Sequence, residues 1–325
     1  MAVAAPGKAQ RAQKTNVPTA EVGEIPNKLP KTKLELISKR TKYSTRFLNP
    51  DGSFTEEIYL DPRYYQDPTD KKWKEIDRTI KNSTGRPSKH ENVKNDFKTW
   101  FADEAGSDDL ITVEKDGKSL SLFPLQSNKV KGSVTNDTIT YSGIYANTDV
   151  RYQVQSGAVK EEIILHQLPA SNTYTFELNL NGVKATTEKD GTIVFSDAKD
   201  NKLWYFEKPY MTDAAGKFSD KVTLALRQEN GKTFVDVSAD QAFLQTAKYP
   251  VTIDPTIDSW DILRDMFVAS AFPTSSYSSN TYMHTGYNSY FGSTRALVQF
   301  YLPSLPSESK ISSATFHAYQ TQNDD

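Results

Sequence analysis

Alternating hydrophobic and polar positions dominate the middle of the chain and predict β-strands. Apolar residues occupy every second position of 174–180, and Asn181-Gly182 follows directly. The same alternation runs through 222–226, and Asn230-Gly231 then leads into the apolar run 233–237. Strict alternation next to an Asn-Gly pair is typical of a β-hairpin. We therefore expect a hairpin turn at each of the two Asn-Gly pairs.

Turn dipeptides recur along the chain at short intervals. Asp51-Gly52, Asp116-Gly117 and Asp190-Gly191 separate further short runs rich in β-branched and aromatic residues. One stretch, residues 93–101, also places apolar residues at helical spacing, but its neighbours are strand-like and favour a strand. The pattern predicts an all-β fold built from sandwiches.

The chain divides into three parts by composition. Residues 1–32 are rich in Pro and polar residues and are expected to be a disordered linker. Residues 40–255 form the predicted β-sandwich region, which ends at the proline-bracketed segment 249–255. Residues 258–325 are expected to begin an incomplete, jelly-roll-like β-sandwich module, with strands over 295–302 and around 314–318.

Charge and composition exclude several classes of protein. The 39 basic and 41 acidic residues give a net charge of -2, so no global field attracts nucleic acid or an anionic membrane. The sequence contains no cysteine, which removes disulfides and thiolate chemistry, and it has no apolar run long enough to span a bilayer. The first residues, Met1 to Gly7, are either an ordinary flexible terminus or the end of an export signal. Both chain ends favour a fragment of a longer protein.

The C-terminal part resembles a known module. The run Arg295-Ala-Leu-Val-Gln-Phe-Tyr-Leu-Pro-Ser-Leu-Pro306, followed by Lys310-Ile-Ser-Ser-Ala-Thr-Phe-His-Ala-Tyr319, is similar to the first half of a DNRLRE domain. That domain is also classed as carbohydrate-binding module family 96. The resemblance covers residues 258–325 and implies a partial module that binds polysaccharide.

The larger upstream part is similar to the N-terminal region of wall-associated protein A and related Rhs or YD-repeat proteins. The matching segments are Lys72-Trp-Lys-Glu-Ile-Asp77, Val159-Lys-Glu-Glu-Ile-Ile-Leu165, Pro209-Tyr-Met-Thr-Asp-Ala-Ala-Gly216 and Tyr249-Pro-Val-Thr-Ile-Asp-Pro-Thr256. Such proteins are exported, and they carry long YD-repeat shells and often a C-terminal toxin. The resemblance implies a secreted, extracellular, cell-wall-associated protein whose C-terminal YD-repeat shell is missing from this sequence.

Aromatic residues in a polar segment define the candidate sugar-binding site. Flat rings beside hydrogen-bonding groups suit the apolar and hydroxyl faces of a sugar, and a guanidinium suits a uronate or phosphate. The alternative is that the rings fill the core and the arginine pairs internally. The candidate residues are Tyr277, Tyr282, His284, Tyr287, Asn288, Tyr290 and Arg295.

Acidic residues near the predicted boundary define a candidate metal site. Asp254, Asp258 and Asp261 supply the hard oxygen ligands that Ca²⁺ prefers. Their spacing does not match an EF-hand, so the alternative is that they cap turns. A structural Ca²⁺ ion is the one cofactor that the sequence raises.

Catalytic motifs are missing from the sequence. None of the four histidines, at positions 90, 166, 284 and 317, lies in a nucleophile motif or at metal-ligand spacing. Glu161 and Glu162 are adjacent, so they face opposite sides of a strand; we expect one to be solvated and the other paired with a lysine. The sequence thus predicts a protein that is not an enzyme.

These observations give one preferred function and two alternatives. The preferred function is a non-catalytic fragment whose module binds cell-wall or other surface polysaccharide and anchors a larger Rhs or YD-repeat protein. The alternatives are a polysaccharide lyase or hydrolase that uses Tyr282 or Tyr287 as base, and a purely structural scaffold of a polymorphic toxin shell. No nucleic-acid partner and no membrane span are expected.

Overall fold

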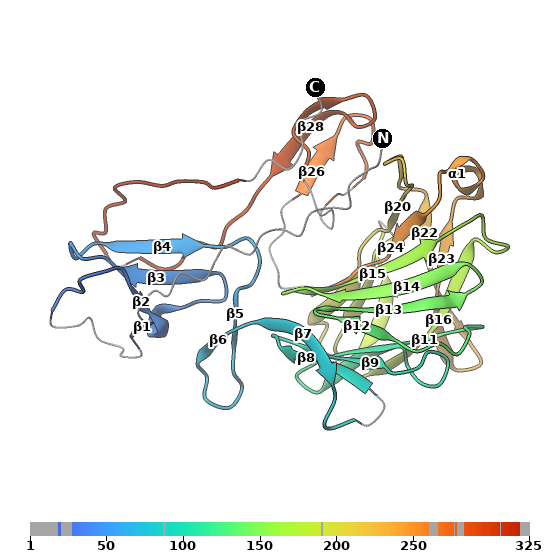
Figure 1. Ribbon diagram of the computed structural model, residues 1–325, viewed down its shortest axis with the longest axis horizontal. Coiled ribbons are helices and arrows are strands. Elements are labelled where there is room, and N and C mark those ends of the chain that lie inside the picture. The colour runs from blue at the N-terminus through green and yellow to red at the C-terminus, as the bar shows by residue number, and fades with distance from the viewer. Residues whose placement is uncertain are drawn as a thin grey trace.

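The chain folds as an all-β protein, as the sequence predicts (Figure 1). The structure is a computed structural model that describes residues 19–20, 28–86, 89–189, 191–259, 266–275, 277, 283–305 and 307–318. Most of the predicted N-terminal linker, residues 1–18 and 21–27, therefore lies outside the described residues.

The first large sheet has eight antiparallel strands. The stretch 93–101, which also fits a helical spacing, lies in two of these strands and their connection, because each strand pairs with neighbours that are strands. In spatial order the strands are β22 (Val222–Glu229), β23 (Lys232–Ala239), β16 (Thr173–Asn181), β11 (Lys118–Pro124), β10 (Ile111–Lys115), β9 (Lys98–Ala102), β8 (Lys89–Lys94) and β7 (Asp77–Asn82).

The second large sheet has eleven strands and packs face to face on the first. Its main path runs through β12 (Ser133–Thr135), β13 (Thr138–Tyr145), β14 (Thr148–Val154), β15 (Ala158–Leu165), β25 (Ile257–Ser259), β19 (Lys202–Phe206), β18 (Ile193–Ser196) and β17 (Lys184–Thr187). The remaining strands are β20 (Tyr210–Thr212), β21 (Phe218–Ser219) and β24 (Val251–Asp254). β15 pairs with β25 through its first half and with β24 through its second half.

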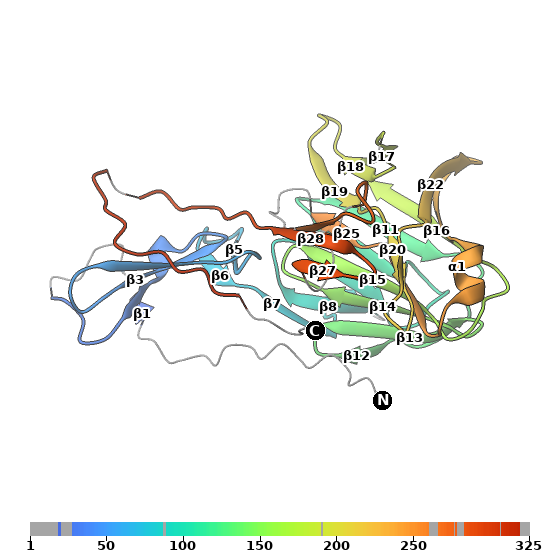
Figure 2. The same cartoon turned by 90° about the horizontal axis from the view of Figure 1, so that it is seen from above.

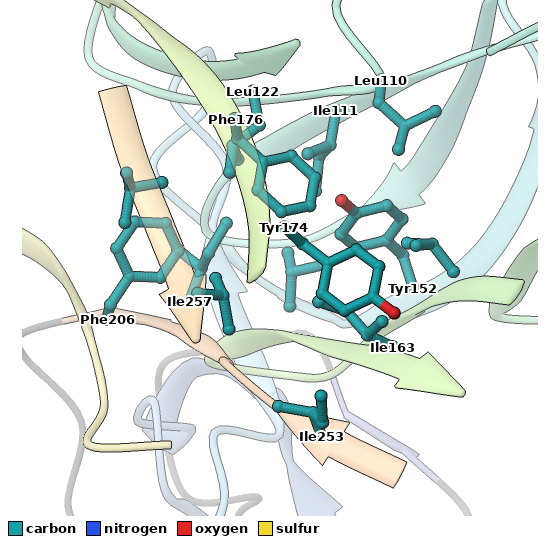
Figure 3. Packing of buried hydrophobic residues seen from close by; sticks show 14 of the residues in the cluster. Leu110, Ile111, Leu122, Tyr152, Ile163, Tyr174, Phe176, Phe206, Ile253 and Ile257 are labelled. Carbon is teal, nitrogen blue, oxygen red and sulfur yellow. The ribbon is translucent and has the colours of Figure 1, made fainter. Parts of the chain in front are cut away.

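The two sheets enclose a single apolar core (Figure 3). The inward positions alternate along each strand, as the period of a pleated strand requires. Burial of these side chains is the main force that holds the sandwich together. Labelled residues of this core include Leu110, Ile111, Leu122, Tyr152, Ile163, Tyr174, Phe176, Phe206, Ile253 and Ile257.

A third, smaller sheet covers part of the outer face of the second sheet. It consists of β26 (Met266–Ala269), β28 (Gly292–Leu297) and β27 (Gly286–Asn288). Phe267 and Phe291 from this part pack against Tyr210 and Phe218 of the second sheet. The polypeptide thus builds three layers, separated by one large and one small apolar core.

A separate N-terminal sheet lies at the other end of the molecule from the two large sheets (Figures 1 and 2). It contains β1 (Thr19–Ala20), β2 (Leu34–Leu36), β3 (Ser44–Leu48) and β4 (Phe54–Ile58), and the pair β5 (Tyr64–Gln66) and β6 (Trp73–Glu75) follows. The segment after β28 returns to this sheet, where the Arg46 guanidinium donates to the Ser304 carbonyl at 3.2 Å and the Tyr43 and Tyr301 rings lie 4.9 Å apart.

Helical structure is brief. The described residues contain a 3-10 turn, η1 (Ile37–Lys39), and one α-helix, α1 (Gln241–Thr246). The Asp240 carboxylate caps α1 by accepting the Phe243 N–H at 3.1 Å, which satisfies one of the free donors at a helix N-terminus. No helix in the described part of the chain is long and apolar enough to cross a bilayer.

The Asn-Gly pairs behave differently from each other. Asn230 and Gly231 both have positive φ and join β22 to β23 in the predicted hairpin. The hairpin predicted at Asn181-Gly182 is wrong, because β16 pairs with β11 and β23 while β17 belongs to the other sheet. The turn is present, with Gly182 at φ +68, but it carries the chain across the sandwich.

The predicted C-terminal strands are shorter than expected. β28 ends at Leu297, so only the first three residues of the strand predicted for 295–302 are in a strand. The described residues around 314–318 form no strand. Leu302 and Phe316 are 77% and 59% exposed. These segments lack a neighbouring strand among the described residues, and an unpaired strand has no partner for its backbone groups.

The close packing beside Gly132 makes a test of the core. A Cβ atom at this position would lie 2.7 Å from Ile139 Cδ1 and 3.0 Å from Tyr141 Cε1, and both side chains are fully buried. We expect Gly132→Ala to lower the free energy of unfolding by about 1–3 kcal/mol in chemical denaturation. Gly85→Ala is the control because nothing lies within 4 Å of its Cβ position. Equal stabilities of the two variants would contradict this packing.

Candidate functional site

Tyr277 is buried, although the sequence proposed it as a sugar-stacking ring. It is 1% exposed, and its ring stacks on Phe267 with centroids 4.3 Å apart. The Phe218 and Phe291 rings lie 5.1 and 5.5 Å away. Its proposed exposure is therefore wrong, because the ring fills the small core between the second and third sheets.

The other predicted aromatic residues are divided between core and surface. Tyr290 is half-buried and packs on Phe272 and Phe291, at 5.4 and 5.0 Å, and burial raises its pKa. Tyr287 is 76% exposed on β27. Tyr282 lies outside the described residues.

The polar residues of the predicted sugar site have local roles. The Asn288 side-chain oxygen accepts the backbone N–H groups of Tyr290 and Phe291 at 3.0 and 2.6 Å, so it shapes the turn between β27 and β28. His284 packs beside Phe267 at 4.9 Å. Arg295 is exposed on β28, directly opposite Val268. The six described residues of this set therefore do not form one exposed surface.

Asp254, predicted as a calcium ligand, lies in a buried ion pair. It is 2% exposed, and its carboxylate accepts Lys160 Nζ at 2.8 Å and the Tyr210 hydroxyl at 2.9 Å. Thr256 Oγ1 donates to the other carboxylate oxygen at 2.5 Å. The assignment of Asp254 to a metal is therefore wrong, since protein donors already use its oxygens.

The other proposed metal ligands do not complete a site. Asp258 is buried on β25, where its backbone pairs with Ala158 and Tyr205. Asp261 lies outside the described residues. Within the part of the chain that the structure describes, no group of three or more acidic or histidine side chains could hold a metal ion.

The buried ion pair shifts the titration of its partners. Burial acts to lower the pKa of Lys160, but the carboxylates of Asp254 and Glu162 outweigh it, so the pKa is raised. Burial, followed by the charge of Asp254, raises the pKa of Tyr210. Lys160 therefore stays charged and Tyr210 stays neutral across the physiological range.

Glu161 and Glu162 do face opposite sides of β15, as expected. Glu162 is ion-paired with Arg151 on β14. Glu161 points into the main core, is 1% exposed, and accepts a hydrogen bond from the Tyr152 hydroxyl at 3.2 Å. Burial raises the pKa of Glu161 to about 8. The expectation of one solvated glutamate is wrong, because the inward position of the strand belongs to the apolar core.

Histidine–aspartate pairs are the feature of the structure that sequence reasoning missed. His166 Nε2 lies 2.9 Å from Asp149 Oδ2, and the Gly143 N–H donates to the other Asp149 oxygen at 2.8 Å. His90 Nε2 lies 3.3 Å from Asp103 Oδ1. The spacings of 17 and 13 residues gave no local signal, because the strand pairing brings each pair together.

The His166–Asp149 pair could move a proton. A carboxylate that holds one imidazole nitrogen fixes the orientation of the ring. The His166 side chain is 49% exposed, so solvent reaches the ring. The nearby Arg151 is already paired with Glu162. The pair therefore presents an oriented imidazole to solvent, as a group that transfers protons requires.

A polar hollow of about 460 Å³ opens on the outer face of the first sheet. Its charges are largely paired internally, since Lys89 Nζ lies 2.9 Å from Asp108 Oδ2 and donates to the Asp109 carbonyl at 3.0 Å. Thr112 and Ser121, in its floor, share a hydrogen bond of 2.9 Å. Gly85, Arg86 and Ser119 complete its lining. The hollow presents hydroxyls and charges of both signs rather than one catalytic group.

Comparison with known proteins identifies similar sequences. The chain is 30% identical over 267 residues to the tRNA nuclease WapA of Bacillus subtilis, an alignment that covers 76% of this chain and 11% of that protein. It is 29% identical over 285 residues to the tRNA3(Ser)-specific nuclease WapA of Bacillus spizizenii, which covers 82% of this chain and 12% of that protein. The chain thus spans about a tenth of the length of these nucleases.

A shorter relative carries a different name. The chain is 23% identical over 192 residues to the wall-associated protein of Geobacillus stearothermophilus, which covers 55% of this chain and 75% of that protein. No family model matches the chain, and no solved structure matches it. The chain is therefore similar to wall-associated proteins and WapA nucleases, while the partial DNRLRE domain gains no support from these comparisons.

These relatives correct the functional expectation drawn from the sequence. Three of these relatives are named tRNA nucleases, and a nuclease is an enzyme. The expectations of a non-enzymatic, polysaccharide-binding anchor and of a polysaccharide lyase or hydrolase are therefore contradicted. The sequence carries no recognisable nuclease motif, and its relation to these nucleases shows only as similarity spread over many residues.

Proposed function

We propose that the protein acts as a wall-associated enzyme that cleaves tRNA. The observation that carries this proposal is the similarity to three named tRNA nucleases over 76–82% of the chain. Because the chain spans about a tenth of those proteins, the activity is proposed for the protein and no described residue is assigned to catalysis.

The proposed location is extracellular, at the cell wall. The alignments with the wall-associated protein and with WapA cover 55% and 76% of the chain, so they must share residues. The shared β-rich region supports one location for both kinds of protein. The finer assignment to exported Rhs or YD-repeat proteins remains part of this proposal.

The charge of the chain is compatible with a tRNA substrate. A net charge of -2 describes the whole molecule, whereas a nucleic-acid site needs only a local group of cations. Cleavage of an RNA strand needs proton transfer and stabilisation of charge on the phosphate. His166, held by Asp149, has a geometry suited to the first of these functions, but neither function is assigned to a described residue.

Capture of the natural protein tests the proposal. An antibody raised against this chain would isolate the protein from the organism that encodes it, and the captured protein would be incubated with total tRNA. We expect discrete tRNA fragments on a denaturing gel, and none from a mock capture of a deletion strain. Intact tRNA in the presence of a detectable amount of captured protein would overturn the proposal.

A further inference from the structure

The first large sheet has one long edge that lacks a partner strand in the described part of the chain. β22 is eight residues long and pairs with β23 on one side only. Figure 2 shows it at the outer margin of the sandwich, away from the β1–β4 sheet. Its outer side presents about 27 Å of backbone donors and acceptors, which is a template for another strand.

The opposite edge of the same sheet is protected. β7 carries Asp77, Arg78 and Lys81, and its pairing with β8 is interrupted by a register shift. The Ile80 N–H also donates at 2.7 Å to the carbonyl of Asn136, in the turn between β12 and β13. Charges, irregular pairing and a covering loop are the devices that keep edge strands from pairing.

β22 has few of these protections. It contains no proline and no lysine, and its charged residues, Arg227 and Glu229, lie near its end. Val222 is buried, Leu224 and Leu226 pack against the main core, and Thr223 and Ala225 are exposed. A strand added here would extend both the hydrogen-bonded ladder and the apolar face.

We propose that β22 is a homodimer interface, in which two copies of this chain pair antiparallel along this strand. A second copy fits because the strand is self-complementary about Ala225. With Ala225 opposite the partner's Ala225, Leu224 lies opposite the partner's Leu226, and Lys221 lies opposite the partner's Glu229. Roughly eight backbone hydrogen bonds result, and each Glu229, whose carboxylate already pairs with Arg227 at 2.7 Å, gains a second cation in the partner's Lys221.

Neighbouring registers fit less well. Centring the pair on Leu224 would place Lys221 opposite the partner's Arg227, and like charges opposite each other are destabilising. Centring it on Leu226 would leave Glu229 opposite the partner's Thr223. A shift by one residue would turn the apolar face of one copy toward solvent. The charges therefore select the register centred on Ala225.

The oligomeric state of the purified chain tests the proposal. We expect a dimer in light scattering after size exclusion and a concentration-dependent equilibrium in sedimentation. Ala225→Lys places two lysines opposite each other, so it should weaken the dimer at least about tenfold. Thr135→Lys, on the exposed edge strand β12 at the opposite end of the second sheet from β17, is the matched control and should leave the dimer intact.

A charge exchange tests the register. Lys221→Glu and Glu229→Lys should each weaken the dimer, and the double variant should restore it, because the ion pairs reform with reversed signs. Circular dichroism would establish that each variant is folded. A chain that stays monomeric up to about 100 μM, or a dimer that withstands Ala225→Lys, would overturn the proposal.

Discussion

Replacing Lys160 with methionine should lower the free energy of unfolding by about 3–5 kcal/mol. The substitution leaves the Asp254 carboxylate, 2% exposed, without its cation. The hydrogen bonds from Tyr210 and Thr256 remain, but two hydroxyls compensate a buried charge only in part. Chemical denaturation followed by tryptophan fluorescence would measure the change.

A second variant separates the lost charge balance from lost packing. Lys160→Met combined with Asp254→Asn removes both charges and keeps a polar group beside Tyr210. This double variant should recover most of the lost stability, because a neutral pair carries no uncompensated charge. If the double variant were as unstable as the single one, the ion pair would not be the cause.

Glu161 should make the sandwich less stable as the pH rises. Its pKa is raised from 4.5 to about 8 in the folded protein, so the native state binds a proton that the unfolded state has lost. Its stabilising contribution is complete below pH 4.5 and is lost as the pH rises toward 8. Between pH 5 and 7.5 the contribution to the free energy of unfolding should fall by ~3 kcal/mol.

Glu161→Gln isolates this effect from all other titrating groups. Glutamine stays neutral and can still accept the hydrogen bond from Tyr152. The variant should match the natural chain near pH 4 and exceed its stability increasingly toward pH 8. The hydrogen bond from Tyr152 favours the charged carboxylate and lowers the pKa of Glu161. Tyr152→Phe removes this bond, so it should raise that pKa and extend to higher pH the range over which stability is lost. Parallel stability curves for the natural chain and Glu161→Gln would contradict a neutral, buried Glu161.

The all-β fold could be predicted because alternation depends on short segments alone. The run 222–237 predicts both strands of the β22–β23 hairpin, because a two-residue turn with positive φ at both positions pairs the strands on either side of it. In the run 173–187, by contrast, alternation predicts the strands but not the sheet to which each belongs. Its Asn-Gly turn is present and only Val183 separates that turn from β17, yet tertiary pairing places β17 in the other sheet.

The aromatic segment was harder to predict because ring exposure is a property of the tertiary structure. A polar surrounding sequence favoured exposure of Tyr277, yet Phe218, nearly sixty residues earlier, supplies the apolar surface that buries it. Tyr287 lies on the outward side of its strand and stays exposed. Composition alone does not distinguish these two positions.

The buried charges could not be predicted for a similar reason. Lys160, Glu161 and Glu162 are adjacent, but their partners lie on β14 and β24, and each partner depends on strand register. His166 likewise meets Asp149 only because β14 and β15 pair. Alternation correctly predicts that Glu161 and Glu162 face opposite sides of β15. The residue that each side chain contacts depends on how the strands pair in the folded protein.

The distribution of tRNA-cleaving activity among cell fractions tests the proposed function most directly. Wall, membrane, cytosolic and medium fractions of the organism would each be assayed for tRNA cleavage before and after depletion with an antibody against this chain. The account predicts activity in the wall fraction that depletion removes. Cleavage that depletion leaves unchanged, or a captured wall protein that leaves tRNA intact, would contradict it.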